Sequence, residues 1–348
     1  MGSRLCGMDI TVPDFIQEKI SICLNTFTFN DNTMSFYLDF EEPLRSHDEA
    51  INALKAESGL SVQKTKNLGI LEDERKKEIK SIFSKLTSWQ KVQLARHPQR
   101  PYTLDFIHSW CPNFLELHGD RNFHDDPAVI TGIGKIDSLS VAIVGQQKGR
   151  NTKENIFRNF GMMRPEGYRK AFRIMKLAEK FGVPVISIID TPGAYPGIGA
   201  EERGQGQAIA KNIMDMASLE VPIVALVIGE GASGGALGIG ICDRFLMLEN
   251  TWFSVISPEG CASILWHDAS KAETAANALK LTPEFLNETG ICDKIIPEPL
   301  GGAHRNWNEL FDTAKVELLA TIKELDSNKS ENFLKQRINK YNSLISME

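Results

Sequence analysis

The chain begins with a weakly patterned stretch and then becomes strongly patterned for helices. Residues 1–33 carry scattered apolar side chains, and the text from Met34 resembles the start of a protein. We therefore expect 1–33 to be a poorly ordered extension and Met34 to be the natural start. From 34 to 96, apolar residues recur at three- and four-residue steps among Glu and Lys, which predicts a helical arm. The prolines of His97–Pro101 end it.

Apolar strands alternating with amphipathic helices follow the arm. The predicted strands are Ser140–Gly145, Val183–Ile189, Val221–Ile228 and Arg244–Glu249, and the predicted helices are Pro165–Lys180, Gly199–Leu219 and Ala236–Cys242. Strands that are apolar on both faces, between helices, indicate an α/β fold whose sheet is covered by helices. The segments from Phe181 and from Leu219 echo each other, which suggests a spiral of repeated units. We expect this domain to span 97–325 and a helical tail to span 326–348.

Two glycine-rich turns follow the predicted strands, DTPGAYPG at Asp190–Gly197 and GEGASGGALG at Gly229–Gly238. Ligands in α/β folds gather at the carboxyl ends of strands, and glycine lets a backbone approach a ligand closely. The second turn leads directly into a helix at Gly234 and Gly235, where backbone N–H groups lack internal partners. Two such groups aimed at one point make an oxyanion hole. Alternatively, the glycines only permit close packing of helix on sheet.

The second turn also matches two other motifs. Residues 231–235 fit the G-x-S-x-G nucleophile elbow of serine hydrolases, and residues 229–234 fit the G-x-G-x-x-G dinucleotide fingerprint. A dinucleotide site needs a full crossover helix, and the predicted strand at Arg244 follows too soon. A hydrolase needs an acid and a histidine to activate Ser233. The available candidates, none marked by its surroundings, are Asp243, His267, Asp293 and His304.

Composition excludes several classes of protein. The formal net charge of −6 and the pI near 5.8 argue against a dedicated nucleic-acid binder. No apolar run reaches the roughly 18 residues of a membrane helix, and no secretion signal precedes Met34. The six cysteines show neither C-x-x-C pairs nor metal-ligand spacing with histidine. We therefore expect a cytoplasmic protein without disulfides, a metal site or membrane contact.

Six dispersed motifs carry a resemblance to a known family. They are ARHPQRPYTLD (95–105), GQQKGRNTKE (145–154), NFGMMRPEGYRKA (159–171), DTPGAYPGIGAEERGQ (190–205), SPEGCASILW (257–266) and IPEPLGGAHRN (296–306). The text from Met34 onward resembles the alpha subunits of bacterial acetyl-CoA carboxylase carboxyltransferases, within the crotonase superfamily. The resemblance implies a crotonase-like spiral of repeated β-β-α units, with an N-terminal helical arm and C-terminal helices. The sequence departs from the family at Gln146, where histidine is common, and at Met163–Arg164.

The resemblance also implies an activity and partners. Such alpha subunits present carboxybiotin, delivered on the biotin carboxyl carrier protein after biotin carboxylase has made it. A beta subunit, which would carry the zinc, binds acetyl-CoA, and an assembly of two alpha with two beta subunits yields malonyl-CoA. Gly234 and Gly235 are the expected oxyanion donors. The expected carboxybiotin-binding wall is Gly193, Ala194, Tyr195, Pro196 and Gly197.

Other charged residues have simpler explanations. Glu201 and Glu202 suit a helix start, where carboxylates are favoured. Glu259 resembles one of the two glutamates of enoyl-CoA hydratases, but the second is missing. The ten Lys and Arg of 148–180 indicate a solvated face, or one that meets CoA phosphates or an acidic carrier surface. Two rival functions stay open: a free-standing crotonase-type acyl-CoA enzyme and a non-catalytic scaffold.

Overall fold

The computed structural model describes residues 36–56, 62–327 and 333–345, so the predicted extension over 1–33 lies outside the described residues. The chain divides into two units, Met1–Phe36 and Tyr37–Glu348, and the second contains all the elements below.

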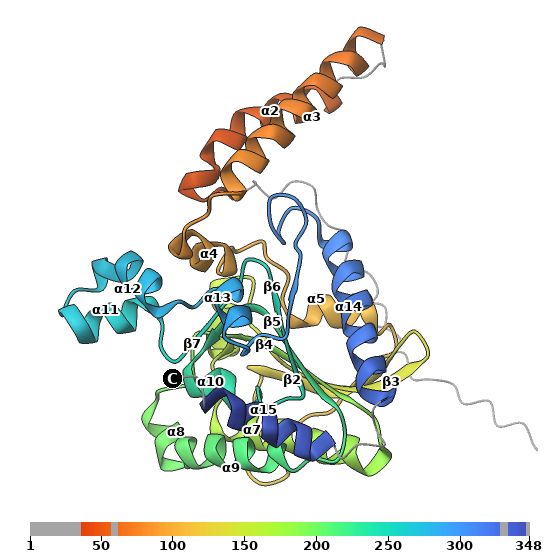
Figure 1. Ribbon diagram of the computed structural model, residues 1–348, viewed down its shortest axis with the longest axis vertical. Helices are drawn as coiled ribbons and strands as arrows, with labels where there is room; N and C mark the ends of the chain where they lie inside the picture. The colour runs from red at the N-terminus through yellow and green to blue at the C-terminus, as the bar shows by residue number, and fades with distance from the viewer. Residues whose placement is uncertain (1–35, 57–61, 328–332, 346–348) are drawn as a thin grey trace, which may run out of the picture. The chain divides into compact units, whose positions relative to one another are not determined.

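The described part of the chain holds one mixed sheet of eight strands (Figure 1). β1, β2 and β3 pair antiparallel, whereas β3, β4, β5, β6 and β8 pair parallel in that order, and β7 pairs with the end of β5. The strands are β1 Leu115–Glu116, β2 Val129–Ile136, β3 Leu139–Gln146, β4 Val185–Thr191, β5 Ile223–Ala232, β6 Arg244–Leu248, β7 Trp252–Ser254 and β8 Lys294–Ile296.

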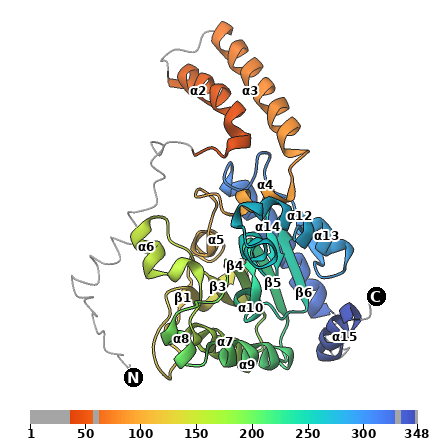
Figure 2. The same ribbon diagram turned by 90° about the vertical axis from the view of Figure 1, so that its left-hand side faces the viewer.

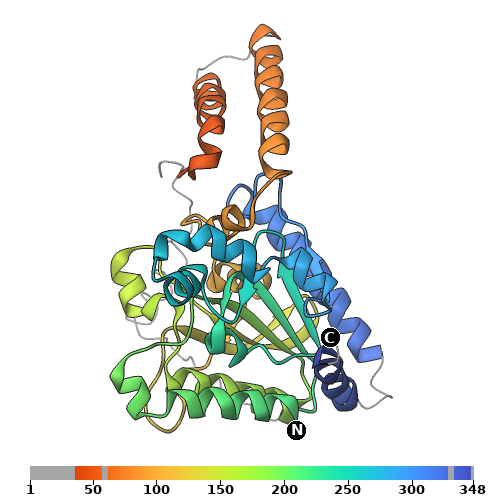
Figure 3. The ribbon, with the colours of Figure 1, turned by 60° about the vertical axis from the view of Figure 1, so that its left-hand side comes forward.

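Helices cover both faces of the sheet, as the apolar strands predicted. Along β4, Val185 and Ile189 pack into a core shared with α7 (Pro165–Phe181) and α9 (Gln205–Ala217). Ile186 and Ile188 point the other way, into a core shared with α5 (Thr103–Trp110) and α14 (Trp307–Ser327). Figure 3 shows α7 and α9 side by side along one face of the sheet, in green. Because both faces are buried, β4 and β5 have no polar face.

The ends of α7 follow its sequence signals. Pro165 occupies the first turn, where its missing N–H matters least, and Gly182 caps the last turn with a φ of 63°. The predicted helix Gly199–Leu219 is wrong in one respect. It is two helices, α8 (Ile198–Glu202) and α9, separated by Gly204 with a φ of 78°.

The second glycine-rich turn also differs from the prediction. β5 continues to Ala232, because Glu230, Gly231 and Ala232 pair with β7. The helix predicted at Ala236–Cys242 is α10, Ser233–Leu237, which begins three residues earlier and ends before Gly238.

The helical arm consists of η1 (Asp39–Glu41), α2 (Glu42–Ala56), α3 (Val62–Phe83) and α4 (Ser88–Ala95). Figure 2 shows α2 and α3 running side by side. The remaining helices are α6 Thr152–Phe157, η2 Asn159–Gly161, α11 Pro258–Trp266, η3 Ala269–Lys271, α12 Ala272–Leu279, α13 Pro283–Glu288 and α15 Phe333–Ile345. Within the described ranges, no helix combines the length and apolar character that a membrane span requires.

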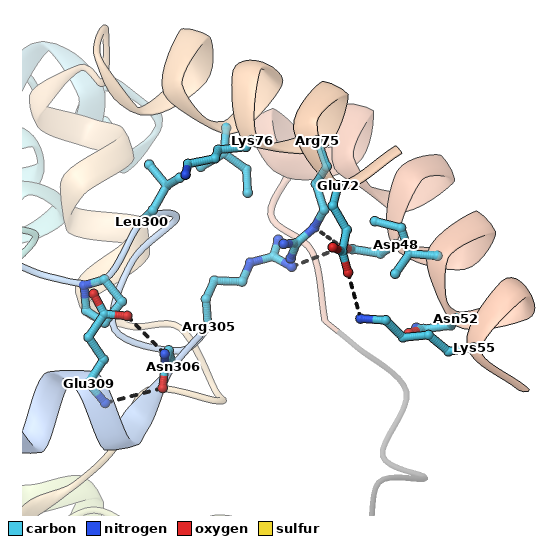
Figure 4. Close-up of a pocket in the computed structure, with 13 residues that line it drawn as sticks. Asp48, Asn52, Lys55, Glu72, Arg75, Lys76, Leu300, Arg305, Asn306 and Glu309 are labelled. Carbon is cyan, nitrogen blue, oxygen red and sulfur yellow. Dashed lines mark hydrogen bonds and ion pairs between the residues drawn. The ribbon is translucent and has the colours of Figure 1, made fainter. Parts of the chain in front are cut away.

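Ion pairs tie the arm to the segment before α14. A cavity of about 410 Å³ lies between α2, α3 and residues 299–309. Figure 4 shows Arg305 reaching toward Asp48, with Nη1 2.9 Å from Oδ2. Arg305 also donates to Glu41, a fully buried carboxylate at the base of α2. The cavity lining mixes both signs of charge, and its closest cations and carboxylates are already paired with each other.

A buried arginine holds α15 against the body. Arg337 is 1% exposed and donates to the Asp243 carboxylate through Nε and Nη2, both at 2.8 Å. Its remaining hydrogens go to the carbonyls of Met216, Leu219 and Val221. The sequence prediction placed this helix in a polar tail and gave no sign of this anchor.

Candidate functional site

The carboxyl ends of three neighbouring parallel strands meet at one edge of the sheet. β3, β4 and β5 are adjacent and parallel, so the residues at their ends lie together. Lys148 follows β3, Asp190 is near the end of β4, and Glu230 is near the end of β5. The segments QKGR, DTPGAYPG and GEGASGG therefore converge at the edge where α/β folds bind ligands.

An ion network that is buried at Asp190 and Glu230 and partly exposed at Arg96 and Glu259 joins these strand ends. Lys148 Nζ lies 2.6 Å from Asp190 Oδ1 and 2.8 Å from Glu230 Oε2. Arg96, which follows α4, donates to the other oxygen of Glu230 at 2.5 Å and also pairs with Glu259 of α11. The Glu230 backbone N–H donates to Asp190 at 3.0 Å. Two cations and three carboxylates thus connect five separate segments of the chain.

The network is charged on both sides. Burial alone would lower the pKa of Lys148, but the adjacent Asp190 and Glu230 carboxylates outweigh burial and raise that pKa. Burial would raise the pKa of Glu230, but Lys148 and Arg96 outweigh it and lower that pKa. Lys148 is therefore a fixed cation near neutral pH. At Asp190, burial outweighs Lys148 and raises the pKa of the carboxyl. The network is suited to holding the strand ends in place.

A cavity of about 220 Å³ opens beside the network. Arg96, Lys148 and Glu230 form its charged side, and Tyr102 and Phe160 contribute aromatic rings. Phe160 is 48% exposed and has a φ of 56°, a left-handed conformation that bulky residues rarely adopt. Such strain persists only where the surroundings impose it, and it concentrates at functional sites.

The two glycine-rich turns are in direct backbone contact. A Cβ atom placed on Gly235 would lie 2.3 Å from the carbonyl carbon of Gly193 and 2.6 Å from the nitrogen of Ala194. A Cβ atom on Gly234 would meet only Ile209, at 3.6 Å. Close packing therefore requires glycine at 235, as the simpler interpretation held, and it also places the two turns side by side.

Backbone N–H groups are available where the turns meet. The first N–H groups of α10 have no acceptor within the helix. The Gly193 N–H donates only locally, to the Thr191 hydroxyl at 3.2 Å. These groups are candidate donors for an oxyanion, and the assignment to Gly234 and Gly235 stays a prediction.

The rest of the first turn is held firmly. The Tyr195 N–H donates to the Met163 carbonyl at 3.1 Å, and Gln205 Nε2 donates to the carbonyls of both residues. The guanidinium carbon of Arg164 lies 4.7 Å from the centre of the Tyr195 ring. A Cβ atom on Gly197 would collide with that ring at 2.3 Å. The turn forms a fixed surface beside α10, and its ligand stays a prediction.

Comparison with known proteins identifies the family. The family model described as "Acetyl co-enzyme A carboxylase carboxyltransferase-like" matches residues 37–345. The acetyl-coenzyme A carboxylase carboxyl transferase subunit alpha of Flavobacterium johnsoniae is 52% identical over 313 residues, which cover 88% of this chain and 98% of the relative. The subunit of the same name from Xanthomonas campestris pv. campestris is 53% identical over 308 residues, 88% of this chain and 97% of the relative. The chain belongs to this family.

Solved structures agree with the fold. The Pseudomonas malonate decarboxylase hetero-tetramer in complex with coenzyme A contains a chain that matches with a TM-score of 0.54 at 14% identity, over 69% of this chain and 94% of that one. The Pseudomonas aeruginosa geranyl-CoA carboxylase beta subunit matches with a TM-score of 0.52 at 16% identity, over 71% of this chain and 46% of that one. The crotonase-like α/β class is confirmed, and the chain is a transferase subunit of a multi-subunit carboxyltransferase.

The ion network joins residues from five of the motifs that the sequence displays. Its members come from ARHPQRPYTLD, QKGR, DTPGAYPG, GEGASGG and SPEG, in the order Arg96, Lys148, Asp190, Glu230 and Glu259. Sequence reasoning quoted these motifs but gave the five charged side chains no joint role. A usable signal existed, because a charge beside an apolar strand is costly to bury without a partner.

The residues that could serve as acid and base for a hydrolase have other partners or are exposed to solvent. Ser233 does occupy a strained strand-to-helix turn, with a φ of 57°, as a nucleophile elbow would. However, His304 is bonded to a glutamate of the arm, and Asp243 and Asp293 pair with basic residues of α15. His267 is exposed at the end of α11. α10, at five residues, is also too short for a dinucleotide crossover.

The other charged residues singled out in the sequence either form ion pairs within the fold or are exposed to solvent. Glu259 pairs with Arg96, which helps to lower its pKa against the effect of burial. Glu201 and Glu202 are exposed on α8. The basic stretch is not one solvated face, since Lys170 within it is 1% exposed and pairs with Asp125.

One group in the described ranges has metal-ligand chemistry, formed by Glu41, His97 and His304, whose ligand atoms lie within 4.8 Å of one another. The two imidazole rings are stacked, with centres 3.8 Å apart, so their in-plane nitrogens cannot both point at one ion. His97 Nδ1 accepts the Gln99 N–H at 3.2 Å, which leaves the proton on Nε2. These three residues are better explained as a hydrogen-bonded cluster that supports the start of the helical arm than as a metal centre.

Proposed function

We propose that this chain is the carboxybiotin half of an acetyl-CoA carboxylase carboxyltransferase. With a beta subunit, it would transfer the carboxyl group of carboxybiotin to acetyl-CoA and so produce malonyl-CoA. The observation that carries this proposal is the contact between Gly193 and Gly235. It sets the first turn beside the start of α10, whose first N–H groups have no acceptor within the helix, in a member of the carboxyltransferase alpha family.

The chemistry suits a site built from backbone and not from a nucleophile. When the N–C bond of carboxybiotin breaks, the carboxyl group leaves as CO2 and negative charge gathers on the urea oxygen. The freed urea nitrogen can accept a proton from the acetyl methyl group, and the resulting carbanion would bond to CO2 to give malonyl-CoA. The N–H groups at Gly234 and Gly235 would stabilise that oxygen, an effect worth roughly 3–4 kcal/mol per donor in measured cases. The wall from Gly193 to Gly197 would align the fused rings of biotin, and the ion network would hold the strand ends from which both turns start.

The proposal assigns the other half of the reaction to partners. No paired carboxylates of the hydratase type lie in the described site, since Glu259 is bonded to Arg96 and α10 supplies no second glutamate. Acetyl-CoA would therefore bind on a zinc-carrying beta subunit, in an assembly of two alpha with two beta subunits. The biotin carboxyl carrier protein would deliver carboxybiotin, and biotin carboxylase would regenerate it.

Reconstitution tests the proposal. Malonyl-CoA-dependent carboxylation of free biotin is measured with the chain alone, with a carboxyltransferase beta subunit alone, and with both. We expect activity only in the mixture. Turnover of an acyl-CoA by the chain alone would favour a free-standing crotonase-type enzyme. A complex with the beta subunit that is fully active and whose rate does not change when Gly235 is substituted would favour a non-catalytic scaffold.

A further inference from the structure

The side chain of Gln146 forms a hydrogen-bonded bridge between the two glycine-rich turns. It is the last residue of β3, and its side chain is fully buried. Its Nε2 donates to the Gly235 carbonyl at 2.8 Å, and its Oε1 accepts the Asp190 N–H at 3.1 Å. One amide therefore connects the end of β4, from which the first turn starts, to α10, which carries the second.

The partners fix how this amide is oriented. A backbone N–H can only donate and a backbone carbonyl can only accept, so the oxygen must face Asp190 and the nitrogen must face Gly235. The Met163 sulfur, 3.5 Å from Nε2, is a further weak acceptor. A flipped amide would turn a donor toward the buried Asp190 N–H and would leave the Gly235 carbonyl with only the longer bond from the Tyr168 hydroxyl, at 3.5 Å, which is unfavourable.

We infer that Gln146 is a positioning residue that sets the separation of the two turns and thereby aims the N–H groups of α10. The inference rests on the proposed function, because it assumes that these N–H groups bind the developing oxyanion. The turns touch through glycine backbone with no room for a Cβ atom, so a small shift at either end of the Gln146 bridge moves the donors. Donor geometry of this kind controls rate more than substrate binding.

The bridge needs one donor and one acceptor, and this requirement makes a sharp test possible. A neutral imidazole also offers one of each, whereas an imidazolium offers two donors and cannot accept the Asp190 N–H. Histidine at this position should therefore support the bridge only while it is neutral. The glutamine found here keeps the bridge at every pH, because an amide does not titrate.

The first experiment uses the reconstituted complex with Gln146→Met, which keeps the length of the side chain and removes both hydrogen bonds. We expect kcat to fall by about 100-fold, as for a misplacement of about 1 Å, with KM for malonyl-CoA nearly unchanged. The matched control is Gln147→Met. Gln147 is also buried, at 5% exposed, and its side chain bridges the Leu104 N–H and the Lys148 carbonyl, so its hydrogen bonds reach neither turn. It should keep kcat close to that of the wild type.

The second experiment measures the rate of Gln146→His, as a ratio to the wild-type rate, across pH. The ratio should be highest above about pH 7 and should fall at a pH below about 6.5, because burial lowers the pKa of the introduced histidine. The titratable groups around this position are Asp190 on β4, Lys148 after β3 and Tyr168 on α7. All three are present in both proteins, so the ratio removes their common titration.

The outcomes separate the two levels of the account. An inactive wild-type complex would overturn the proposed function. An active wild type with a Gln146→Met complex of equal kcat would overturn only the positioning role. A flat ratio for Gln146→His would overturn it as well, as would an equal loss of kcat in Gln147→Met.

Discussion

Lys148 Nζ lies 2.6 Å from the Asp190 carboxylate, at the point where β3 and β4 end. The lysine side chain is 12% exposed and the aspartate side chain 3%, so the pair is removed from water. A buried cation of this kind, shared with Glu230, gives the strand ends a fixed geometry. The glycine-rich turns begin from those ends.

Removing this cation should destabilise the fold. Lys148→Met leaves Asp190 and Glu230 facing each other with only Arg96 nearby, and we expect a loss of about 3 kcal/mol, as for other broken buried pairs. Urea unfolding followed by circular dichroism measures the loss. Lys211→Met, which removes an exposed pair with Asp215, is the control and should cost less than about 1 kcal/mol. Equal effects of the two variants would show that the network does not hold the strand ends.

The anchor of α15 should behave similarly. Arg337→Ala leaves the Asp243 carboxylate buried without its cation and removes donors from three carbonyls. We expect a loss of about 3–5 kcal/mol and faster amide exchange along α15. Arg244→Ala breaks the exposed pair with Glu324 and a hydrogen bond to the Asp243 carbonyl but leaves the Asp243 carboxylate paired with Arg337, so it serves as the control. Unchanged exchange in α15 after the loss of Arg337 would contradict the anchor.

The buried Glu41 should make the stability of the helical arm depend on pH. Burial would raise its pKa, but the His304 hydrogen bond and Arg305 outweigh burial and lower the pKa to about 2. Because the folded pKa is below the ordinary value of 4.5, the stabilisation is complete above about pH 4.5 and is lost as the pH falls toward 2. The stability difference between wild type and Glu41→Gln should shrink by about 2 kcal/mol between about pH 7 and pH 3. A difference that stays constant over this range would refute the assignment.

The sequence correctly predicted the elements whose position depends on neighbouring residues. The apolar run before Asp190 and the Pro165 and Gly182 boundaries of α7 each follow from neighbouring residues alone. The break at Gly204 could not be predicted, because a single glycine inside an amphipathic pattern is usually tolerated. β5 extends to Ala232 through glycines that resemble a turn, because β7, some twenty residues later, pairs with them.

The site was predictable only in part. The motifs placed both glycine turns at strand ends, and the structure brings Gly193 and Gly235 together. The ion-pair partners of Glu230 could not be predicted from the sequence, because Arg96 lies 134 positions away and no local feature distinguishes it from other arginines. The sequence marks Gln146 only as a departure from the family, because its contacts are with two backbone groups that sequence cannot locate.

Ser233 should be dispensable for catalysis. Its hydroxyl is hydrogen-bonded to no histidine among the described residues, so we expect Ser233→Ala to keep most of the rate of the reconstituted complex. Treatment of the wild type with a fluorophosphonate probe should leave no covalent label. Labelling that disappears in Ser233→Ala would instead establish a serine hydrolase.

The most direct measurement of the central claim is the rate of carboxyl transfer by the complex carrying Gly235→Ala. The added Cβ would lie 2.3 Å from Gly193, so the turns must separate and the N–H donors must move. We predict a rate loss of roughly 100- to 1,000-fold with circular dichroism unchanged. Gly234→Ala, whose Cβ has room beside Ile209, should lose less than about tenfold, since the donors keep their places. A folded Gly235→Ala complex that transfers carboxyl groups at the wild-type rate would contradict the account.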